Sequence, residues 1–368
     1  MGRQPHQFRM AATLTLVLIL MGCSRREPEG SNEGIEPTQV GQRGWVHSLA
    51  FSPDSKYLVV SSKIKGKGFA VWEVGSQKEV FWARGGSRAI AFSPDGKTMA
   101  LSGQLELPGA FFPDDKPKEW GPPVTLWDTT TWKEKTRPAI ADVDSVHFLA
   151  FHPKEDLLFV AGRQLRDTVL LLWDLKAGKA RYKKEPHKFG ISAFALSPDG
   201  SIFVTGGDTV KVWEAATGKK LWSFGAHPST EGVNHVSCVA FLPDGNTFAT
   251  GGNDGKVRLW NLKAKKEKAV LSGELYDSRT LAVSADGKVI VVGGSNLGDL
   301  RGLVEFWEIS TGKRLARLNV PSVHRVALSS DGKWLATGTA DGTKKGGPNK
   351  RGAVELWKMA EVLGKKSK

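Results

Sequence analysis

The chain has 368 residues, of which 40% are hydrophobic and 24% charged, so it can bury a core and is not disordered as a whole. Only two cysteines occur, which excludes a disulfide scaffold and a cysteine-based zinc site. The formal net charge of +14 raises the question of a nucleic-acid partner. The 13 tryptophans against 3 tyrosines suggest that one tryptophan position is repeated along the chain.

Residues 1–22 have the pattern of an export signal peptide. Basic residues precede an apolar run over residues 10–21, and this run is shorter than the roughly 20 residues that a membrane-spanning helix needs. A small residue, Gly22, stands directly before Cys23. The sequence therefore predicts that the protein is exported.

The string LMGC at residues 20–23 resembles the lipobox of bacterial lipoproteins. The resemblance implies that Cys23 is lipidated and becomes the mature N-terminus, which would anchor the protein to a membrane. It also implies an outer-membrane or cell-surface destination, because Ser24 replaces the aspartate that favours inner-membrane retention. The alternative is that Cys23 merely lies near an ordinary cleavage site. Residues 23–36 are polar and predict a flexible tether.

A string related to Ser-Pro-Asp-Gly recurs seven times, with a mean spacing of about 46 residues, which is typical of a repeat architecture. Its copies begin at Ser52, Ser93, His152, Ser197, Leu242, Ser284 and Ser329. Apolar runs that alternate with period two flank each copy, and a third run ends in a tryptophan. These tryptophans are Trp72, Trp127, Trp173, Trp213, Trp260, Trp307 and Trp357. Each unit predicts four antiparallel strands: a before the turn, b after it, c ending at the tryptophan, and d.

The repeat resembles that of the WD40 family over about residues 40–360. The resemblance implies an all-β fold in which residues 37–360 form a seven-bladed β-propeller of four-stranded antiparallel blades around a central channel. The Trp-Asp dipeptide occurs only at residues 127–128 and 173–174. The polar tetrad of the family is expected only in blade 5, where Asp254 precedes strand c.

The closure of the ring also follows from the chain. Only 11 residues follow Trp357, so blade 7 lacks its own strand d, and residues 361–368 predict a basic tail. In the WD40 family an N-terminal strand often completes the last blade. We therefore expect residues 38–41 to pair with strand c of blade 7 near residues 354–357.

The loops between strands b and c vary most. From the end of strand b to the tryptophan they span 10, 24, 11, 6, 8, 13 and 18 residues, whereas the a–b segment is constant. Variable loops on a rigid scaffold often carry binding sites, although insertions can also be tolerated without function. The blade 2 loop is aromatic and acidic, and its aromatic side chains either anchor a partner or fold onto blade 2 or 3. The candidate partner-binding residues are Phe111, Phe112 and Trp120 in blade 2, and the basic Lys344, Lys345, Lys350 and Arg351 in blade 7.

One repeat position near the start of strand a is cationic in five blades. Its occupants are His47, Arg88, His147, Arg279 and His324, with Ser192 and Ser237 in the other two. The pattern predicts a cationic ring at one mouth of the channel, which would bind an acidic peptide or an anionic group. The alternative is a set of solvated residues at strand starts. The histidines belong to blades 1, 3 and 7, too far apart to share a metal ion.

The chain shows none of the motifs of a nucleophile elbow, a zinc protease or a phosphate-binding loop. Cys238 lies in a strand a and is expected to be buried. Residues 342–368 carry +6 of the net charge, without the aromatic pattern of nucleic-acid binders. We therefore expect no enzymatic activity, catalytic residue, cofactor, metal or nucleic-acid partner.

The sequence thus predicts a monomeric, membrane-tethered propeller that acts as a non-catalytic protein-interaction platform in the cell envelope, with unidentified and acidic protein partners. An alternative rests on residues 217–222 (TGKKLW), which resemble the repeat of quinone-cofactor propellers and of outer-membrane assembly lipoproteins. That resemblance implies a quinoprotein-like or outer-membrane-assembly-type propeller lipoprotein.

Overall fold

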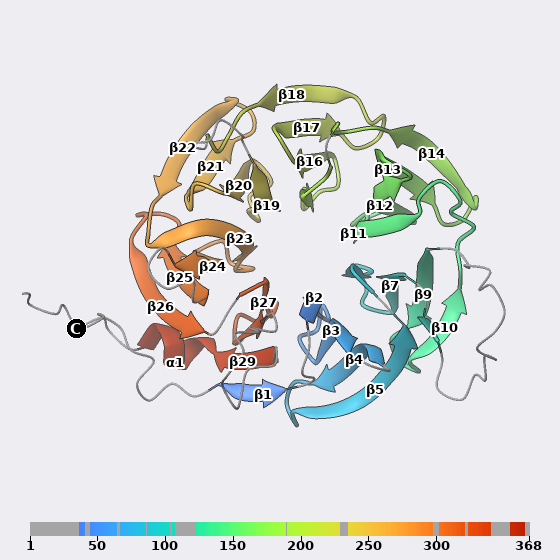
Figure 1. Cartoon of the computed structure of the whole chain (residues 1–368), viewed down its shortest axis with the longest axis horizontal. Coiled ribbons are helices and arrows are strands. Elements are labelled where there is room, and N and C mark those ends of the chain that lie inside the picture. The colour runs from blue at the N-terminus through green and yellow to red at the C-terminus, as the bar shows by residue number, and fades with distance from the viewer. Residues whose placement is uncertain are drawn as a thin grey trace, which may run out of the picture.

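A computed structural model describes residues 37–40, 45–64, 67–85, 87–103, 105–106, 123–188, 190–228, 235–296, 302–320, 323–339 and 354–364. Within these ranges, seven antiparallel sheets surround a central channel as the blades of a propeller (Figure 1). The predicted seven-bladed, all-β fold is therefore confirmed. The expected signal peptide, Cys23 and the tether lie outside the described residues.

The first four blades follow the chain in order. Blade 1 contains β2 (Trp45–Phe51), β3 (Tyr57–Ile64), β4 (Lys67–Glu73) and β5 (Lys78–Gly85). Blade 2 contains β6 (Ile90–Phe92), β7 (Thr98–Ser102), β9 (Val124–Asp128) and β10 (Lys133–Thr136). Blade 3 contains β11 (Ser145–Phe151), β12 (Leu157–Gln164), β13 (Asp167–Asp174) and β14 (Lys179–Lys184). Blade 4 contains β15 (Ala193–Leu196), β16 (Ile202–Gly206), β17 (Val210–Glu214) and β18 (Lys220–Phe224).

The remaining blades complete the ring, with strand a innermost in each. Blade 5 contains β19 (Val236–Phe241), β20 (Thr247–Gly252), β21 (Val257–Asn261) and β22 (Lys266–Leu271). Blade 6 contains β23 (Leu275–Val283), β24 (Val289–Asn296), β25 (Gly302–Glu308) and β26 (Arg314–Val320). Blade 7 contains β27 (Arg325–Leu328), β28 (Trp334–Gly338), β29 (Val354–Lys358) and the N-terminal β1 (Thr38–Val40).

The N-terminal strand closes the ring as predicted. Strand β1 pairs antiparallel with β29, so that Thr38 lies opposite Leu356 and Val40 lies opposite Val354 (Figure 1). The Val40 side chain is fully buried and packs in one cluster with Val46 of blade 1. The closure therefore gains both backbone hydrogen bonds and apolar burial at the junction of blades 7 and 1.

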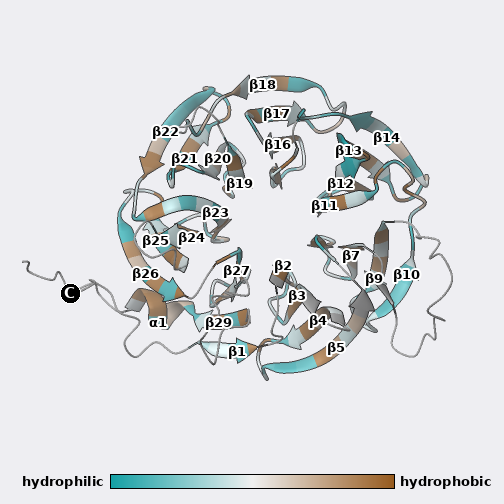
Figure 2. Cartoon of the chain, viewed as in Figure 1, coloured by the Kyte–Doolittle hydropathy of each residue, from teal (hydrophilic) through white to brown (hydrophobic). Residues whose placement is uncertain are grey.

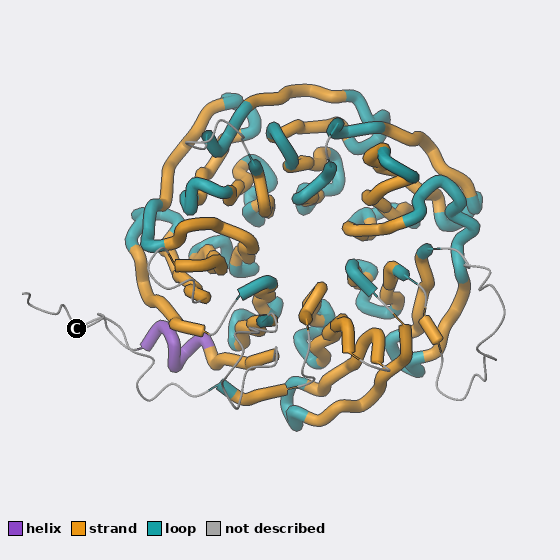
Figure 3. The backbone as a smooth tube through the Cα atoms, viewed as in Figure 1, coloured by secondary structure: helices purple, strands orange, loops and turns teal. Residues whose placement is uncertain are grey.

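The end of the chain differs from the expected basic tail. Residues Met359–Gly364 form helix α1, which is coloured purple in Figure 3. Met359 and Val362, three residues apart on one helix face, are buried in a cluster with Leu318 of β26. The apolar face of the helix explains why this segment folds against blade 6, and residues 365–368 lie outside the described residues.

The turn between strands a and b depends on a hydrogen bond between the first and third residues of the repeated string. In blade 2 the Ser93 hydroxyl donates to Asp95 at 2.6 Å, and the same Asp95 oxygen accepts the Lys97 backbone N–H at 3.0 Å. Gly96 has a φ of +70°, a left-handed conformation that favours glycine. The same serine–aspartate bond recurs in blades 1, 4, 6 and 7.

The core lies between the blades, because strands b and c are covered on both sides by neighbouring sheets. Phe159 of blade 3 and Phe203 of blade 4 lie with ring centroids 5.4 Å apart, and Phe203 stacks on Trp213 at 5.8 Å. In outer strands such as β10 and β14, exposed residues alternate with partly buried ones, and Figure 2 shows hydrophilic segments there. The result is a rigid ring whose innermost strands line the channel.

Candidate functional site

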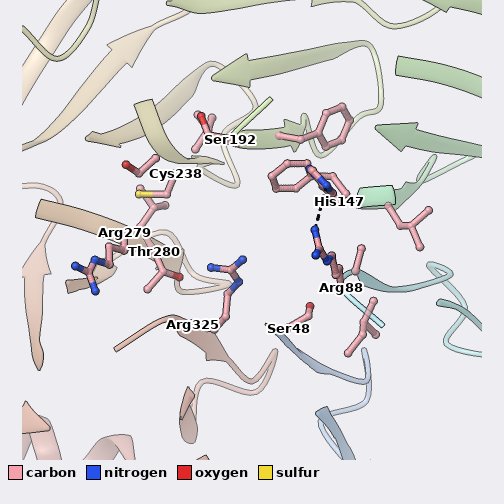
Figure 4. Close-up of a pocket in the computed structure, with 17 residues that line it drawn as sticks. Ser48, Arg88, His147, Ser192, Cys238, Arg279, Thr280 and Arg325 are labelled. Atoms are coloured by element: carbon pink, nitrogen blue, oxygen red, sulfur yellow. Dashed lines mark hydrogen bonds between the residues drawn. The ribbon is translucent and has the colours of Figure 1, made fainter. Parts of the chain in front are cut away.

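A cavity of about 200 Å³ lies in the channel where the innermost strands begin. All seven blades contribute lining residues, and Figure 4 shows eight of them with labels. Strand a begins at the same end of each blade as the loop between strands b and c. The cavity therefore opens on the face that carries the variable loops.

Local bulges turn side chains toward this mouth. In blades 1, 3, 5 and 6 the register between strands a and b shifts at the predicted ring position, which is occupied by His47, His147, Ser237 and Arg279. Two residues of strand a then face one residue of strand b, and the extra residue is not paired in the ladder. The bulge thus explains why this repeat position is free to carry polar side chains.

The structure places only part of the predicted ring at the cavity. Arg88, His147 and Arg279 line it, together with the equivalent Ser192 and Ser237. His47 and His324 do not line it, and their immediate successors Ser48 and Arg325 do. His324 interacts electrostatically with His47, Arg279 and Arg325, so the two histidines lie near the cations of the cavity without lining it. Arg325 is a cation at the cavity that the sequence did not predict.

Arg88 and His147 come from neighbouring blades and meet at the mouth. Arg88 Nη1 lies 3.5 Å from His147 Nε2 (Figure 4). The same His147 nitrogen lies 3.2 Å from the Ser145 hydroxyl. Burial lowers the pKa of His147, and the positive charges of Arg88 and Arg163 lower it further. The imidazole is therefore neutral at pH 7 while no anion is present.

Arg325 lies one position further along strand a than the predicted ring. Its Nη1 donates to the His324 carbonyl at 2.8 Å, and in Figure 4 its guanidinium projects into the channel. The side chain is exposed to solvent, and partial desolvation by the channel wall around it lowers its pKa. The charge thus stands in a partly desolvated position, where an opposite charge would be stabilising.

Arg279 differs from Arg88 and Arg325 because its charge is matched. Its Nε donates to Asp277 Oδ2 at 2.7 Å, and the other Asp277 oxygen accepts hydrogen bonds from the Ser295 N–H and hydroxyl.

The candidate partner-binding residues of the loops lie outside the described residues; they are Phe111, Phe112, Trp120, Lys344, Lys345, Lys350 and Arg351. The blade 2 loop begins with β8 (Leu105–Glu106), which pairs with β5 and so adds a fifth strand to blade 1.

Cys238 lines the cavity wall as a buried free thiol, as expected from the sequence. Its Sγ donates to the Ser278 carbonyl at 3.4 Å, and burial raises the pKa of the thiol to about 12. A thiol that stays protonated is a poor nucleophile. Among the described residues, no three His, Cys, Asp or Glu side chains gather closely enough to hold a metal ion.

The polar tetrad forms in blade 5 as expected. His227 Nδ1 lies 2.8 Å from Asp254 Oδ1, and its Nε2 lies 2.8 Å from the Thr250 hydroxyl. The same hydroxyl accepts the indole N–H of Trp260 at 2.9 Å. The network ties the segment that enters strand a to strands b and c, which fixes the geometry of the mouth.

The expectation that no other blade has this tetrad is wrong for blade 4. His187 lies 2.9 Å from both Asp208 and the Thr205 hydroxyl, which accepts the indole N–H of Trp213 at 2.9 Å. The shorter loop of blade 4 moves the aspartate from six to five residues before the tryptophan. A search for His and Asp that allowed this deletion would have found the network.

The sequence was compared with protein families, and one family model matches the stretches that contain the tetrads. The family model described as "WD domain, G-beta repeat" matches residues 35–63, 178–214, 218–261 and 312–343, and the two central stretches contain both tetrads. Within the described ranges, no helix reaches the length and apolar character needed to cross a membrane.

Several curated proteins are similar to parts of the chain. Telomerase protein component 1 of Rattus norvegicus is 30% identical over 198 residues, which are 53% of this chain and 7% of the relative. Angio-associated migratory cell protein of Homo sapiens is 25% identical over 204 residues, 54% of this chain and 44% of the relative. Small ribosomal subunit protein RACK1y of Oryza sativa subsp. japonica is 30% identical over 153 residues, 39% of this chain and 42% of the relative.

The chain spans less than half the length of each of these relatives. The matched stretches, the repeated turn and the two tetrads describe the same four-stranded unit. The protein is a seven-bladed β-propeller, and the stretches that the family model matches are similar to WD-domain repeats.

Proposed function

We propose that the protein is a non-catalytic interaction platform that binds an acidic protein partner over the channel mouth. The observation that carries the proposal is the gathering of Arg88, Arg325 and His147 around one cavity. Acidic surfaces are attracted to such a cationic opening, and the field of the rigid ring would orient them. The proposal extends to a location in the cell envelope, with the chain tethered to a membrane through lipid on Cys23.

Exposed apolar side chains support the choice of this face. Among the described residues, five large hydrophobic side chains are exposed, and Val80, Leu221 and Val270 of these lie on outer strands. The other two, Leu165 and Tyr276, lie at the end of the blades where the channel mouth opens. Leu165 is 87% exposed at the tip of the β12–β13 hairpin. Tyrosine and arginine are among the residues that contribute most to binding at protein interfaces, so Tyr276 is the exposed apolar side chain that supports this face best.

The platform is tested by capture of partners from the membranes of cells that express the full-length protein. The variant R88Q/R325Q removes two cations from the mouth, and its matched control K97Q/K333Q removes two exposed cations from the a–b turns on the opposite face. We expect the first variant to lose partners that the wild type and the control both retain. Identical partner sets for the wild type and R88Q/R325Q would contradict binding at the mouth.

The membrane tether is tested separately. We expect metabolic labelling with a fatty-acid analogue to modify the wild type and to leave C23S unmodified. Equal labelling of both proteins, or no labelling of either, would contradict lipidation at Cys23.

A further inference from the structure

Among the seven equivalent positions that follow the predicted ring position, Arg325 of blade 7 is the charged residue. The residue that follows the predicted ring position is neutral in the six other blades, where it is Ser48, Ala89, Phe148, Ala193, Cys238 or Thr280. Ser48, Phe148, Cys238 and Thr280 each pair with the corresponding residue of strand b, as Arg325 pairs with Gly338. Blade 7 therefore places one guanidinium in a ring of otherwise neutral wall residues.

The charges of Arg325 and Arg88 are not matched by a carboxylate in the described part of the chain. Arg258, Arg314 and Arg317, by contrast, each contact an acidic side chain within 2.6–3.3 Å. A guanidinium carries five N–H donors, and one carbonyl accepts from Arg325. The remaining donors are available to a ligand in the cavity, which Arg88 also lines.

We propose that Arg325, Arg88 and His147 form a binding site for a carboxylate side chain that a partner protein inserts into the channel mouth. This inference rests on the proposed function and adds the chemistry that the partner must present. A carboxylate accepts two hydrogen bonds from one guanidinium in parallel, which makes arginine well suited to this ligand.

The lining of the cavity favours an acidic side chain over a free inorganic ion. Ile90, Leu149 and Val239 contribute apolar wall beside the cations. The aliphatic stem of a glutamate would cover this wall while its carboxylate meets the guanidinium groups. A cavity of about 200 Å³ accepts one such side chain and excludes a nucleic-acid duplex.

The site couples ligand binding to the protonation of His147. The charged groups that face this imidazole are Arg88 and Arg163, and the neutral Ser145 hydroxyl lies beside it. An added carboxylate opposes both positive charges and so raises the pKa of His147. Binding therefore strengthens as the pH falls from 8 to 6, a range in which glutamate stays ionised.

The test uses a hexaglutamate peptide with blocked ends, titrated into the folded protein, with hexaglutamine as the uncharged control. We expect R325Q and R88Q each to weaken binding about tenfold or more, because each removes a charged hydrogen-bond donor. R166Q removes an exposed arginine at the same face but away from the channel, and we expect less than about a twofold change because exposed charges are screened. Thermal unfolding of each variant confirms that it is folded.

Nuclear magnetic resonance of the His147 ring supplies a second readout. At a peptide concentration that just saturates the wild type, we expect hexaglutamate to raise the pKa of His147 clearly in the wild type and much less in R325Q. Equal losses in R166Q and R325Q, or equal binding of hexaglutamine, would overturn the site. So would sulfate that binds and moves the His147 pKa while the peptide does not, since the site would then hold a free anion.

Failure of this site and failure of the platform are distinguishable. A wild-type protein that captures membrane partners but does not bind hexaglutamate keeps the platform and loses the carboxylate site. A protein that binds the peptide through Arg325, yet captures the same partners as R88Q/R325Q, keeps the site and loses the proposed platform at the mouth.

Discussion

Glu305 in blade 6 and Glu355 in blade 7 occupy the same repeat position, two residues before the tryptophan of strand c, and both are buried. Glu305 accepts a hydrogen bond from Arg314 at 3.0 Å and another from the Glu274 backbone N–H. Among the described residues, Glu355 accepts one bond, from the Thr337 hydroxyl at 3.3 Å. The same repeat position thus holds one buried carboxylate that is paired with an arginine, Glu305, and one that is hydrogen-bonded to a single hydroxyl among the described residues, Glu355.

We expect E355Q to stabilise the protein at pH 7. Burial raises the pKa of Glu355, so the folded state binds this proton more tightly than the unfolded chain does. The contribution is favourable at acid pH and is lost as the pH rises through the raised pKa. Glutamine is neutral throughout, so the gain should be roughly 1 kcal/mol at pH 7 and absent near pH 4. Thermal unfolding at the two pH values measures it.

The matched variant E305Q should act in the opposite direction at pH 7. It weakens the contact with Arg314, which is itself partly buried beside Glu274. Loss of a charged hydrogen-bond partner from a partly buried group costs roughly 1–3 kcal/mol. If E305Q and E355Q changed the unfolding temperature in the same direction, compensation by Arg314 would not explain the difference between the blades.

A substitution at Val40 tests whether strand β1 stabilises the closed ring. Its side chain is fully buried in the cluster between blades 7 and 1, whereas the adjacent Gln39 is exposed. We expect V40S to lower the free energy of unfolding by roughly 2–4 kcal/mol, since it removes apolar burial and adds a buried hydroxyl. Q39S should change it by less than about 0.5 kcal/mol. Chemical denaturation compares the two, and similar values would argue against closure by β1.

Thr250 tests the tetrad of blade 5. T250V leaves both the His227 ring and the Trp260 indole N–H without their shared partner, which should cost roughly 1–3 kcal/mol. The control is T125V in blade 2, where the buried Thr125 hydroxyl accepts from the Trp127 indole. We expect a smaller loss there, because one group and not two is left unpaired. An equal or larger loss in T125V would contradict the network.

Substitutions at Leu165 test whether its left-handed backbone conformation destabilises the folded protein. It has a φ of +55°, which disfavours leucine, and its N–H donates to Asp144 Oδ2 at 2.6 Å. Asparagine tolerates this conformation, so we expect L165N to raise the free energy of unfolding by about 0.5–1 kcal/mol. L165A removes the same side chain but keeps the strain and should bring no gain. Equal stabilisation by both variants would point to removal of exposed apolar surface instead.

Cys238 should resist alkylation in the folded protein. With a pKa of about 12, its thiolate is scarce at pH 8, and the thiol is buried. We expect iodoacetamide to label the C23S protein only after denaturation. Labelling of the native protein at the rate of a free thiol would show that the channel wall opens.

Much of the fold could be predicted because the repeat encodes it locally. The period-two strands and the tryptophan recur in every unit and the serine–aspartate turn in five of the seven, and each feature acts within a few residues. The pairing of β1 with β29 followed from counting strands, because blade 7 lacked its fourth. Helix α1 was missed because its apolar residues have a partner only once blade 6 is folded.

The site was less predictable. Counting along strand a identified Arg88, His147 and Arg279, but it chose His324 in blade 7, where the structure places Arg325 at the cavity. Arg325 follows the predicted ring position, and the residue at the equivalent place is neutral in the other six blades. A count of cations at the ring position therefore could not find Arg325, because only the folded ring shows that both positions reach the cavity.

The sequence by itself determined the number of blades, their strand order and the strand that closes the ring, because these depend on repeated short-range chemistry and on a count of strands. Only the tertiary structure decided which charges share an environment. Arg88 and Arg325 lie in blades 2 and 7, at opposite ends of the chain, and ring closure brings both to one cavity. The tertiary structure also pairs Glu305 with Arg314 and leaves Glu355 without a comparable cation among the described residues. Such contacts depend on how whole strands pack.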